Sequence, residues 1–216
     1  MKKLLNIYEE FLDEDYPIEF DMEHFKSLTS FNKRIKYCEA KLDRISSGSS
    51  RIVYQIDDEK VLKLAKNTKG LAQNEVEIEY GQYHDLSYIV ARTFDHHPKD
   101  LWLEMELAEK VSKGRFESIT GFKWNDYCLA VSKHGYNVDN SINKYNPYVD
   151  PEVQERMWED QDFCYEIFSF IGNYGLPVGD LLKLSTYGVV KRDHGESIVI
   201  IDYGLTQEVN TNYYSR

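Results

Sequence analysis

Cysteine is scarce in this sequence, and the cysteines that occur have no recognisable spacing. Cys38, Cys128 and Cys164 lie far apart and are odd in number. This pattern argues against a disulfide framework or a cysteine metal site and predicts reduced, mostly buried thiols. Reduced thiols are typical of the cytoplasm, which we therefore expect as the location of the protein.

Long apolar runs are also absent, and basic residues are outnumbered. Nowhere do about 18 apolar residues follow one another, so no membrane-spanning helix is expected. Residues 1–10 contain two lysines but no long apolar core or small-residue cleavage site, so we expect no signal peptide. Lys and Arg total 26 against 37 Asp and Glu, a net charge of −11, which argues against general nucleic-acid binding.

The apolar and aromatic content is sufficient for a folded core. The chain has 216 residues, of which 42% are hydrophobic and 14% aromatic, and tyrosine is unusually frequent at 17 residues. This length fits one large domain or two small lobes that share a cleft.

Three helices are predicted before the first strand, over residues 2–14, 22–28 and 30–42, because apolar residues recur at helical spacing. The first ends before Pro17. These helices are expected to pack on the sheet that follows. The alternative is a docking surface for a protein partner.

Residues 43–66 have the alternation of short strands. A strand, a serine-rich turn and a second strand run from Arg44 to Ile56, and a third strand covers residues 60–65. The turn contains Ser47, Gly48 and Ser49, and such small residues let backbone N–H groups approach a phosphate. Lys63 lies on the otherwise apolar third strand and needs a counter-charge or a phosphate.

A helix over residues 71–80 offers carboxylates after that strand. Glu75 and Glu79 share one face at i,i+4, whereas Glu77 points elsewhere. A solvated acidic face is the alternative for at least two of the three. Strands are then expected at 88–94 and 101–107, joined by a turn whose adjacent histidines, His96 and His97, we expect to be solvated.

Residues 114–172 are predicted to be mainly helical, with one helix from about Lys123 to His134 and another from Glu152 to Asn173. A hairpin follows. Its strands include Val189–Val190 and Ile198–Ile201, with the polar turn 191–196 between them. Asp180 lies before the hairpin and Asp202 directly after it, so antiparallel pairing brings both acids to one end of the ribbon. Two acids so placed suit phosphoryl transfer.

Asp202-Tyr203-Gly204 resembles the metal-binding Asp-Phe-Gly motif of the protein-kinase-like fold, and Asp180-Leu181 resembles the start of its catalytic loop. There are departures. Ser185 stands where kinases have a metal-binding Asn, and Val178-Gly179 stands where His-Arg is usual. The serine-rich turn has one glycine instead of three.

The resemblance implies a role for each candidate residue. The turn at Ser47, Gly48 and Ser49 would cover the phosphates of ATP, and the backbone near Met105 and Leu107 would pair with the adenine edge. Mg²⁺ would bind Asp202, with Ser185 or Thr186 as a weak further ligand. The residues assigned to catalysis are Asp180, which would orient the acceptor hydroxyl, Lys63, and Glu75 as its partner, with Glu79 as runner-up.

The resemblance also implies an α+β class and a bilobal architecture. We expect an N-terminal helical extension (1–42), a small β-rich lobe with one helix (43–107) and a reduced, mostly helical lobe (108–216). Little chain follows Thr206, where protein kinases continue with a substrate-binding platform. In this the chain resembles the truncated kinase-like proteins of large tailed bacteriophages.

Three functions remain open from the sequence. The first is a kinase-like ATP/Mg-binding protein, with phosphotransfer to an unknown acceptor. The second is a kinase-fold protein with weak or no catalysis (a pseudokinase), serving as a phage structural or host-interaction component in the host cytoplasm or the virion. The third is an unrelated α+β binding protein, which predicts that Asp180 and Asp202 lie far apart.

Overall fold

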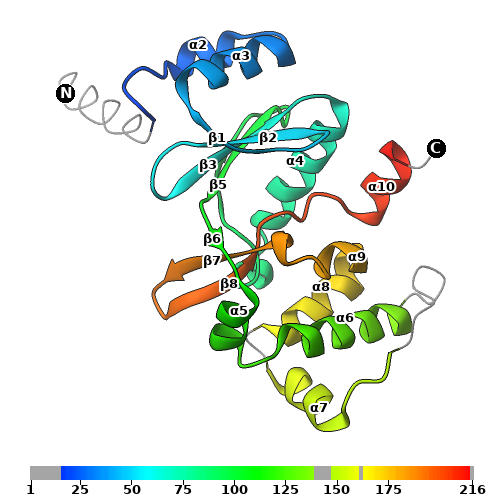
Figure 1. The fold of residues 1–216 in the computed structure, drawn as a ribbon. Coiled ribbons are helices and arrows are strands. Elements are labelled where there is room, and N and C mark those ends of the chain that lie inside the picture. Colours follow the sequence, from blue (N-terminus) through cyan, green and yellow to red (C-terminus); the bar gives the residue numbers. More distant parts are fainter. Residues whose placement is uncertain (1–15, 139–146, 161–162, 215–216) are drawn as a thin grey trace, which may run out of the picture. The chain divides into compact units, whose positions relative to one another are not determined.

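The computed structural model describes residues 16–138, 147–160 and 163–214. The chain divides into two compact units (Figure 1). The first comprises Met1–Asn74 and Thr93–Leu107, and the second comprises Glu75–Arg92 and Ala108–Arg216. Helix α4 (Thr68–Gly81) begins in the first unit and ends in the second. Within the described ranges no helix has both the length and the apolar character that a bilayer crossing needs.

The first unit contains an antiparallel sheet in the order β1-β2-β3-β5-β4. Its five strands are β1 (Asp43–Ser47), β2 (Arg51–Gln55), β3 (Lys60–Ala65), β4 (Thr93–His96) and β5 (Trp102–Glu106). Helix α4 directly follows β3, as expected from the sequence. The predicted α+β class, with an antiparallel sheet and a mainly helical region, is confirmed.

Two helices precede the sheet, as predicted. Helix α2 (Met22–Ser27) begins where the Asp21 side chain accepts a hydrogen bond from the His24 N–H, and α3 (Phe31–Lys41) begins at the corresponding bond from the Lys33 N–H to Ser30. Their apolar side chains form one buried cluster with the sheet, which includes Phe25, Cys38, Tyr54, Leu62, Leu64 and Trp102. The packing expectation therefore holds for these helices, whereas the helix expected over residues 2–14 lies outside the described residues.

The two faces of the sheet differ in what they carry. Leu62 and Leu64 on β3 belong to the cluster under α2 and α3. Lys63 lies between them in sequence and therefore points to the opposite face. Residues directly opposite in an antiparallel ladder share a face, so Lys63 stands beside Val53 of β2 and Leu103 of β5.

The prediction of a strand at 88–94 is wrong for the first part of that range. Only the segment from Thr93 onward pairs with β5. Earlier in this stretch, Val90 makes an isolated parallel bridge to Ile200, and the Ala91 N–H donates to the Ile200 carbonyl oxygen at 3.0 Å. The Arg192 guanidinium also donates to the carbonyl oxygens of Ser87 and Val90. These hydrogen bonds hold the stretch within the second unit.

The second unit is mainly helical. Its α-helices after α4 are α5 (Lys113–Thr120), α6 (Trp124–Val138), α7 (Pro151–Glu159), α8 (Cys164–Tyr174), α9 (Val178–Leu181) and α10 (Gln207–Tyr213). The single helix expected over 152–173 is in fact two. Asp160 separates them: its N–H donates to the Arg156 carbonyl oxygen at the end of α7, and its carboxylate accepts the Cys164 N–H at the start of α8.

A three-stranded sheet completes the second unit, in the order β6-β7-β8. The strands are β6 (Glu109–Lys110), β7 (Tyr187–Arg192) and β8 (Gly195–Ile200). The hairpin turn is shorter than predicted, because Arg192 pairs with Gly195 and leaves only two residues between them. Gly195 has φ +112°, a backbone conformation that residues with a side chain rarely adopt.

Buried tyrosines support the loop that follows α9. The Tyr187 hydroxyl donates to the Leu181 carbonyl oxygen at 3.0 Å, and the Tyr127 hydroxyl lies 2.7 Å from that of Tyr187. Both rings are fully or almost fully buried and contact Phe116. The high tyrosine content therefore serves, in part, to hold the backbone next to Asp180.

Candidate functional site

Lys63 is the most deeply buried of the candidate charged residues. Its relative exposure is only 5%, and its neighbours across the ladder, Val53 and Leu103, are apolar. Burying an ammonium group among apolar side chains is costly unless an opposite charge or a hydrogen-bonding partner compensates. The sequence prediction of a half-buried lysine on an apolar strand therefore understated how far Lys63 is buried.

The serine-rich turn between β1 and β2 is held by the chain that follows β3. The Lys66 ammonium donates to the Gly48 carbonyl oxygen at 2.8 Å, and the Asn67 side chain donates to that of Ser49 at 3.1 Å. The Ser50 hydroxyl donates to Gln73 on α4 at 2.8 Å. The Gly48 N–H, which was expected from the sequence to approach a phosphate, donates to the Arg51 carbonyl oxygen at 2.9 Å, so this donor is occupied within the turn.

Gly70 allows α4 to begin close to that turn. A Cβ at this position would lie 2.3 Å from the Ser50 carbonyl oxygen and 3.0 Å from the Cα of Ala65. Both contacts are with backbone atoms, which cannot rotate away. The start of α4 and the serine-rich turn are therefore packed as one piece, and this packing requires glycine.

The segment expected to meet an adenine edge is more constrained than predicted. Met105 lies inside β5 with 1% exposure, paired with Val61 of β3. The Leu107 N–H was expected to be exposed, but it donates to the Glu59 carbonyl oxygen at 2.7 Å. The pairing of β5 with β3 thus continues to Leu107, the last residue of the predicted strand, and occupies this donor.

In the second unit, Asp180 lies in the short helix α9 and forms an ion pair with a lysine three residues later. The Lys183 ammonium donates to Asp180 Oδ1 at 2.6 Å. The backbone is fixed as well, because the Thr186 hydroxyl donates to the Asp180 carbonyl oxygen at 2.7 Å. The sequence interpretation did not single out Lys183, although its i,i+3 spacing from Asp180 on a helical turn was a usable signal.

Asp202 is exposed and directly follows β8 and Ile201. In the β7–β8 ladder Tyr187 is paired with Ile200, and the next residue, Ile201, donates its N–H to the Thr186 carbonyl oxygen at 2.8 Å. Asp180 and Asp202 therefore lie at the same end of the hairpin. The pKa of Lys183 is raised, first by its hydrogen bond to Asp180, then by the charge of Asp180, and also by the charge of Asp202.

Lys183 is therefore within electrostatic reach of both carboxylates. The Thr186 hydroxyl donates to the Asp180 carbonyl oxygen and the Thr186 carbonyl oxygen accepts the Ile201 N–H, so Thr186 joins the backbone at Asp180 to the residue before Asp202. This contradicts the separation of Asp180 and Asp202 that the third hypothesis predicted.

The carboxylates of α4 are arranged differently from the sequence expectation. Glu75 and Glu79 are exposed, which fits the solvated acidic face, whereas Glu77 is fully buried. Glu77 Oε1 accepts the Tyr203 N–H at 3.2 Å and the Gly204 N–H at 3.1 Å. Glu77, and not Glu75, is thus the α4 carboxylate in contact with the Asp-Tyr-Gly segment.

A sequence signal for Glu77 did exist. The buried residues Gly70, Gln73, Asn74 and Glu77 follow one another at helical spacing along α4. Because three of the four are polar, a search for apolar periodicity does not find this face. A search for any residue type at i, i+3, i+4 and i+7 would have placed Glu77 on it.

The residues available beside Asp202 for a metal are few. Ser185 is exposed in a single 3-10 turn, η2 (Leu184–Thr186), and could turn its hydroxyl outward. Thr186, the other hydroxyl considered, is buried and donates to Asp180. In the described part of the chain no group of three or more His, Cys, Asp or Glu is arranged to hold a metal ion.

The free cysteines show no sign of reactivity. Cys38 and Cys164 are buried and Cys128 is half-buried. Burial, the larger cause, and the charge of Glu39 raise the pKa of Cys38 to about 12. A thiol with so high a pKa is a poor nucleophile at neutral pH.

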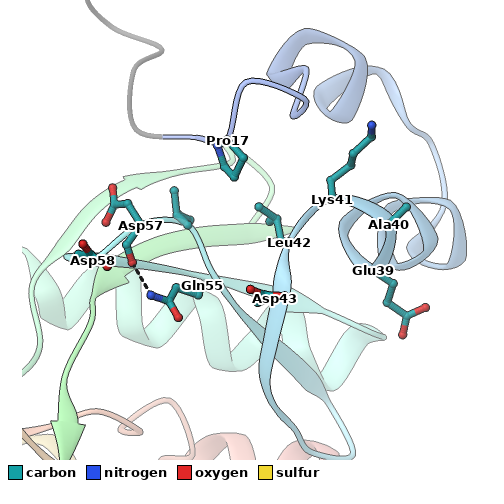
Figure 2. Close-up of a pocket in the computed structure, with 10 residues that line it drawn as sticks. Pro17, Glu39, Ala40, Lys41, Leu42, Asp43, Gln55, Asp57 and Asp58 are labelled. Atoms are coloured by element: carbon teal, nitrogen blue, oxygen red, sulfur yellow. Dashed lines mark hydrogen bonds between the residues drawn. The ribbon is translucent and has the colours of Figure 1, made fainter.

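A cavity of about 410 Å³ lies in the first unit, beside α3 (Figure 2). Its lining includes Pro17, Leu42 and the turn between β2 and β3, where the Gln55 side chain donates to the Asp57 carbonyl oxygen at 2.9 Å. None of the residues predicted to bind nucleotide or metal lines it. The cavity is a feature of how the N-terminal helices pack on the sheet.

Comparison with known proteins finds no matching family model and no matching curated protein. Similar solved structures include the streptomycin–ATP ternary complex of the phosphotransferase APH(2")-IIa (13% identity, 87% of this chain and 73% of that chain, TM-score 0.35). The ADP-bound aminoglycoside phosphotransferase APH(2'')-Ib is also similar (13%, 81% and 69%, TM-score 0.34), as is the gentamicin complex of APH(2")-IIa (15%, 87% and 71%, TM-score 0.35). Similarity this distant carries no information about individual site residues.

Proposed function

We propose that this chain binds ATP with magnesium and transfers a phosphoryl group to a hydroxyl acceptor. The observation that carries the proposal is the group at the end of the β7–β8 hairpin. Asp180 is ion-paired with Lys183, and Thr186 joins the backbone at Asp180 to Ile201, the residue before Asp202. The residues after Asp202 are hydrogen-bonded to the buried Glu77. Paired acids with a nearby cation suit a reaction in which positioning and charge neutralisation supply most of the catalysis.

Asp202 would hold magnesium through its exposed carboxylate, and the hydroxyl of Ser185 would be a weaker ligand. Carboxylate and hydroxyl oxygens are the donors that this hard cation accepts, and it commonly uses only one or two carboxylates together with substrate phosphates. Bound magnesium would neutralise negative charge on the phosphates. The hydrogen bonds from the Tyr203 and Gly204 N–H groups to Glu77 fix the backbone next to Asp202.

Asp180 would orient the acceptor hydroxyl, and Lys183 would place a positive charge beside the transferred group. The Lys183 ammonium is bonded to Asp180 at 2.6 Å, and its side chain remains 63% exposed. An exposed lysine is free to exchange one anionic partner for another at little cost. Arrival of a phosphate could therefore draw Lys183 from Asp180 and free that carboxylate for the acceptor.

In the first unit, Lys63 and the serine-rich turn would bind the phosphates. Strand β3, which carries Lys63, pairs with β2, the strand that leaves the serine-rich turn. Adenine would meet the backbone that follows Met105, because Met105 itself is paired with β3 and β4 and the Leu107 N–H is engaged. We retain the division into residues 1–42, 43–107 and 108–216 as a proposal for the functional parts of the chain.

A thermal-shift experiment tests this function. A ligand that binds only the folded state raises the apparent stability by about 2.7 kcal/mol at a hundredfold excess over its dissociation constant. Mg-ATP should raise the unfolding midpoint of the wild type, and the rise should shrink in Lys63→Ala and in Asp202→Ala. Glu117→Ala, which changes an exposed side chain of α5 that is not assigned to the site, is the control and should respond like wild type. No shift of the wild type at millimolar Mg-ATP would refute the proposal.

A second function is favoured by one observation. Ser185 occupies the position of the metal-binding Asn and offers only a hydroxyl, while the Thr186 hydroxyl is engaged by Asp180. The corresponding proposal is a pseudokinase that binds nucleotide but turns it over weakly or not at all. Such a protein would act through a partner, as a phage structural or host-interaction component, with α2 and α3 as its contact surface.

ATP turnover distinguishes the two functions. Wild-type protein that binds Mg-ATP but releases no phosphate to acceptor or water would favour the pseudokinase. In that case Ser185→Asn, which supplies the amide ligand, should create measurable turnover, and Ser185→Ala should not. Turnover by the wild type that falls in Asp180→Asn would favour the phosphotransferase.

A further inference from the structure

We infer that the hydroxyl of Tyr203 is a positioning group that holds the Asp202-Tyr203-Gly204 segment in its metal-binding arrangement. The metal-binding part rests on the proposed function; the structural part does not. Phenylalanine at this position would fill the same space but could not make these hydrogen bonds. Tyr203 would therefore act through Asp202, without touching nucleotide or metal itself.

The hydrogen bonds run in both directions between Glu77 and the segment. Tyr203 is completely buried, and its hydroxyl lies 3.3 Å from the Glu77 carbonyl oxygen and 3.2 Å from that of Ala91. In return, Glu77 Oε1 accepts the N–H groups of Tyr203 and Gly204. We call these contacts among Glu77, Ala91, Tyr203 and Gly204 the clasp.

The clasp joins the segment after Asp202 to two elements, helix α4 and the stretch around Ala91. Glu77 belongs to α4, while Ala91 belongs to the stretch bridged to the end of β8, where its N–H donates to the Ile200 carbonyl oxygen at 3.0 Å. Ile200 in turn donates to the Ile89 carbonyl oxygen at 2.7 Å. The Tyr203 side chain thus returns to the same stretch that pairs with the residue two positions before Asp202.

Asp202 is therefore fixed from both sides, although its own side chain is exposed. Before it, Ile200 and Ile201 are held by backbone hydrogen bonds to Ile89 and Thr186. After it, Tyr203 and Gly204 are held by the clasp. The carboxylate consequently projects from a backbone that is already ordered without ligand, and binding a metal there requires little further loss of conformational entropy.

Tyr203→Phe removes one part of the clasp with little disturbance of packing. The ring of Tyr203 contacts that of Phe170, with centroids 6.4 Å apart, and phenylalanine retains this contact. What is lost is a neutral hydrogen bond shared by two buried carbonyl oxygens. Such a bond contributes enough to change a local equilibrium by about three- to tenfold.

Hydrogen exchange of metal-free, ligand-free protein tests the structural part. We expect amide exchange in peptides spanning residues 200–206 to be about three- to tenfold faster in Tyr203→Phe than in wild type. Tyr80→Phe is the matched control, because its hydroxyl makes a longer bond, 3.4 Å to the Tyr174 carbonyl oxygen, outside the clasp. Equal exchange in Tyr203→Phe and wild type would overturn the inference whether or not the protein binds ATP.

A magnesium titration tests the positioning. With ATP present, Tyr203→Phe should require about three- to tenfold more Mg²⁺ for half-maximal binding, while its affinity for ATP without metal should equal that of wild type. An unchanged Mg²⁺ requirement, despite faster exchange, would overturn the positioning role and leave the proposed function intact. A wild type with no Mg²⁺-dependent ATP binding would instead overturn the proposed function, and the metal-binding part of the inference with it.

Discussion

The two units hold their charged groups by different means. In the first, Lys63 is placed by a regular strand, and the ladder of β2, β3 and β5 sets it beside Val53 and Leu103. In the second, Asp180 lies in the single helical turn of α9 and Asp202 lies on irregular backbone, and both positions depend on individual hydrogen bonds from groups such as Thr186 and Tyr203. A strand inside a sheet thus positions a charged group through the packing of its neighbours. A single helical turn or an irregular segment does so through hydrogen bonds of individual backbone polar groups. Substitutions that remove packing and substitutions that remove hydrogen bonds should therefore lower the free energy of unfolding by different amounts.

The largest expected effect comes from the packing of the first unit. Phe25 is completely buried between α2 and the sheet and contacts Trp102, so Phe25→Ala should lower the free energy of unfolding by about 3–5 kcal/mol. Urea unfolding followed by tryptophan fluorescence measures this. Ile18→Ala, at a fully exposed position of the same extension, should change it by less than about 0.5 kcal/mol. Similar small effects for both variants would show that the extension does not stabilise the sheet.

In the second unit, loss of a hydrogen-bond acceptor should lower the free energy of unfolding by a somewhat smaller amount. Glu77→Ala removes the acceptor of two buried N–H groups, and each such group left without a partner costs about 1–3 kcal/mol. We expect a loss of about 3 kcal/mol by chemical denaturation.

Two variants of the same helix make this result specific. Glu77→Gln retains a carbonyl oxygen and should lose clearly less stability, and Glu75→Ala should lose almost none because its side chain is exposed. If Glu77→Ala and Glu75→Ala were equally stable, the clasp could not be holding the Asp-Tyr-Gly segment.

The same substitution at two buried tyrosines should have opposite effects. Tyr203→Phe loses a bonded hydroxyl and should destabilise by about 1 kcal/mol. The Tyr54 hydroxyl, in the first unit, is buried without a hydrogen-bond partner among the described residues, so Tyr54→Phe should be neutral or stabilising. Unfolding midpoints compared side by side measure the difference. A destabilised Tyr54→Phe would mean that the packing of the first unit contains a polar contact the structure does not show.

The smallest expected effect is on the way in which the stability of the first unit depends on pH. Glu104 is 6% exposed, and its pKa is raised by burial above all; the Tyr16 hydrogen bond lowers it, and the charge of Asp95, opposite on β4, raises it. A raised carboxyl pKa means that the folded state binds the proton more tightly than the unfolded chain. The resulting stability is present below the unfolded pKa, about 4.3, and is lost as pH rises through the folded value.

Glu104→Gln cannot titrate and should therefore gain stability relative to wild type as pH is raised from about 4 to 8. Urea unfolding of both proteins across that range gives the difference. Glu106→Gln, at the less buried end of β5, is the control. A constant difference between Glu104→Gln and wild type at every pH would contradict the raised pKa.

Prediction from sequence succeeded where a local pattern determines the structure. Strands β1, β2 and β3 form in the short segments bounded by turn residues where strands were predicted, and α2 and α3 form where apolar residues recur at helical spacing. The placement of Asp180 and Asp202 at one hairpin end followed from antiparallel pairing alone. These features depend on neighbours within a few residues.

Prediction failed where distant residues decide. The stretch 88–92 has the composition of a strand, but Arg192 and Ile200, about a hundred residues later, hold its backbone. Glu77 was passed over because its face of α4 is polar and is buried against Tyr203 and Gly204. No local pattern contains such contacts, and only complete pairing of the buried polar groups reveals them.

The most direct test of the central claim is calorimetric titration of ATP with and without Mg²⁺, using wild type, Lys63→Met and Asp202→Asn. The wild type should bind ATP more tightly with Mg²⁺. Lys63→Met should lose affinity under both conditions, because it removes the positive charge that we propose to contact the phosphates. Asp202→Asn should lose only the gain due to Mg²⁺. Wild-type protein that is folded but binds no ATP in either condition, or variants that bind as wild type does, would contradict the assignment of this chain as an ATP- and magnesium-binding protein.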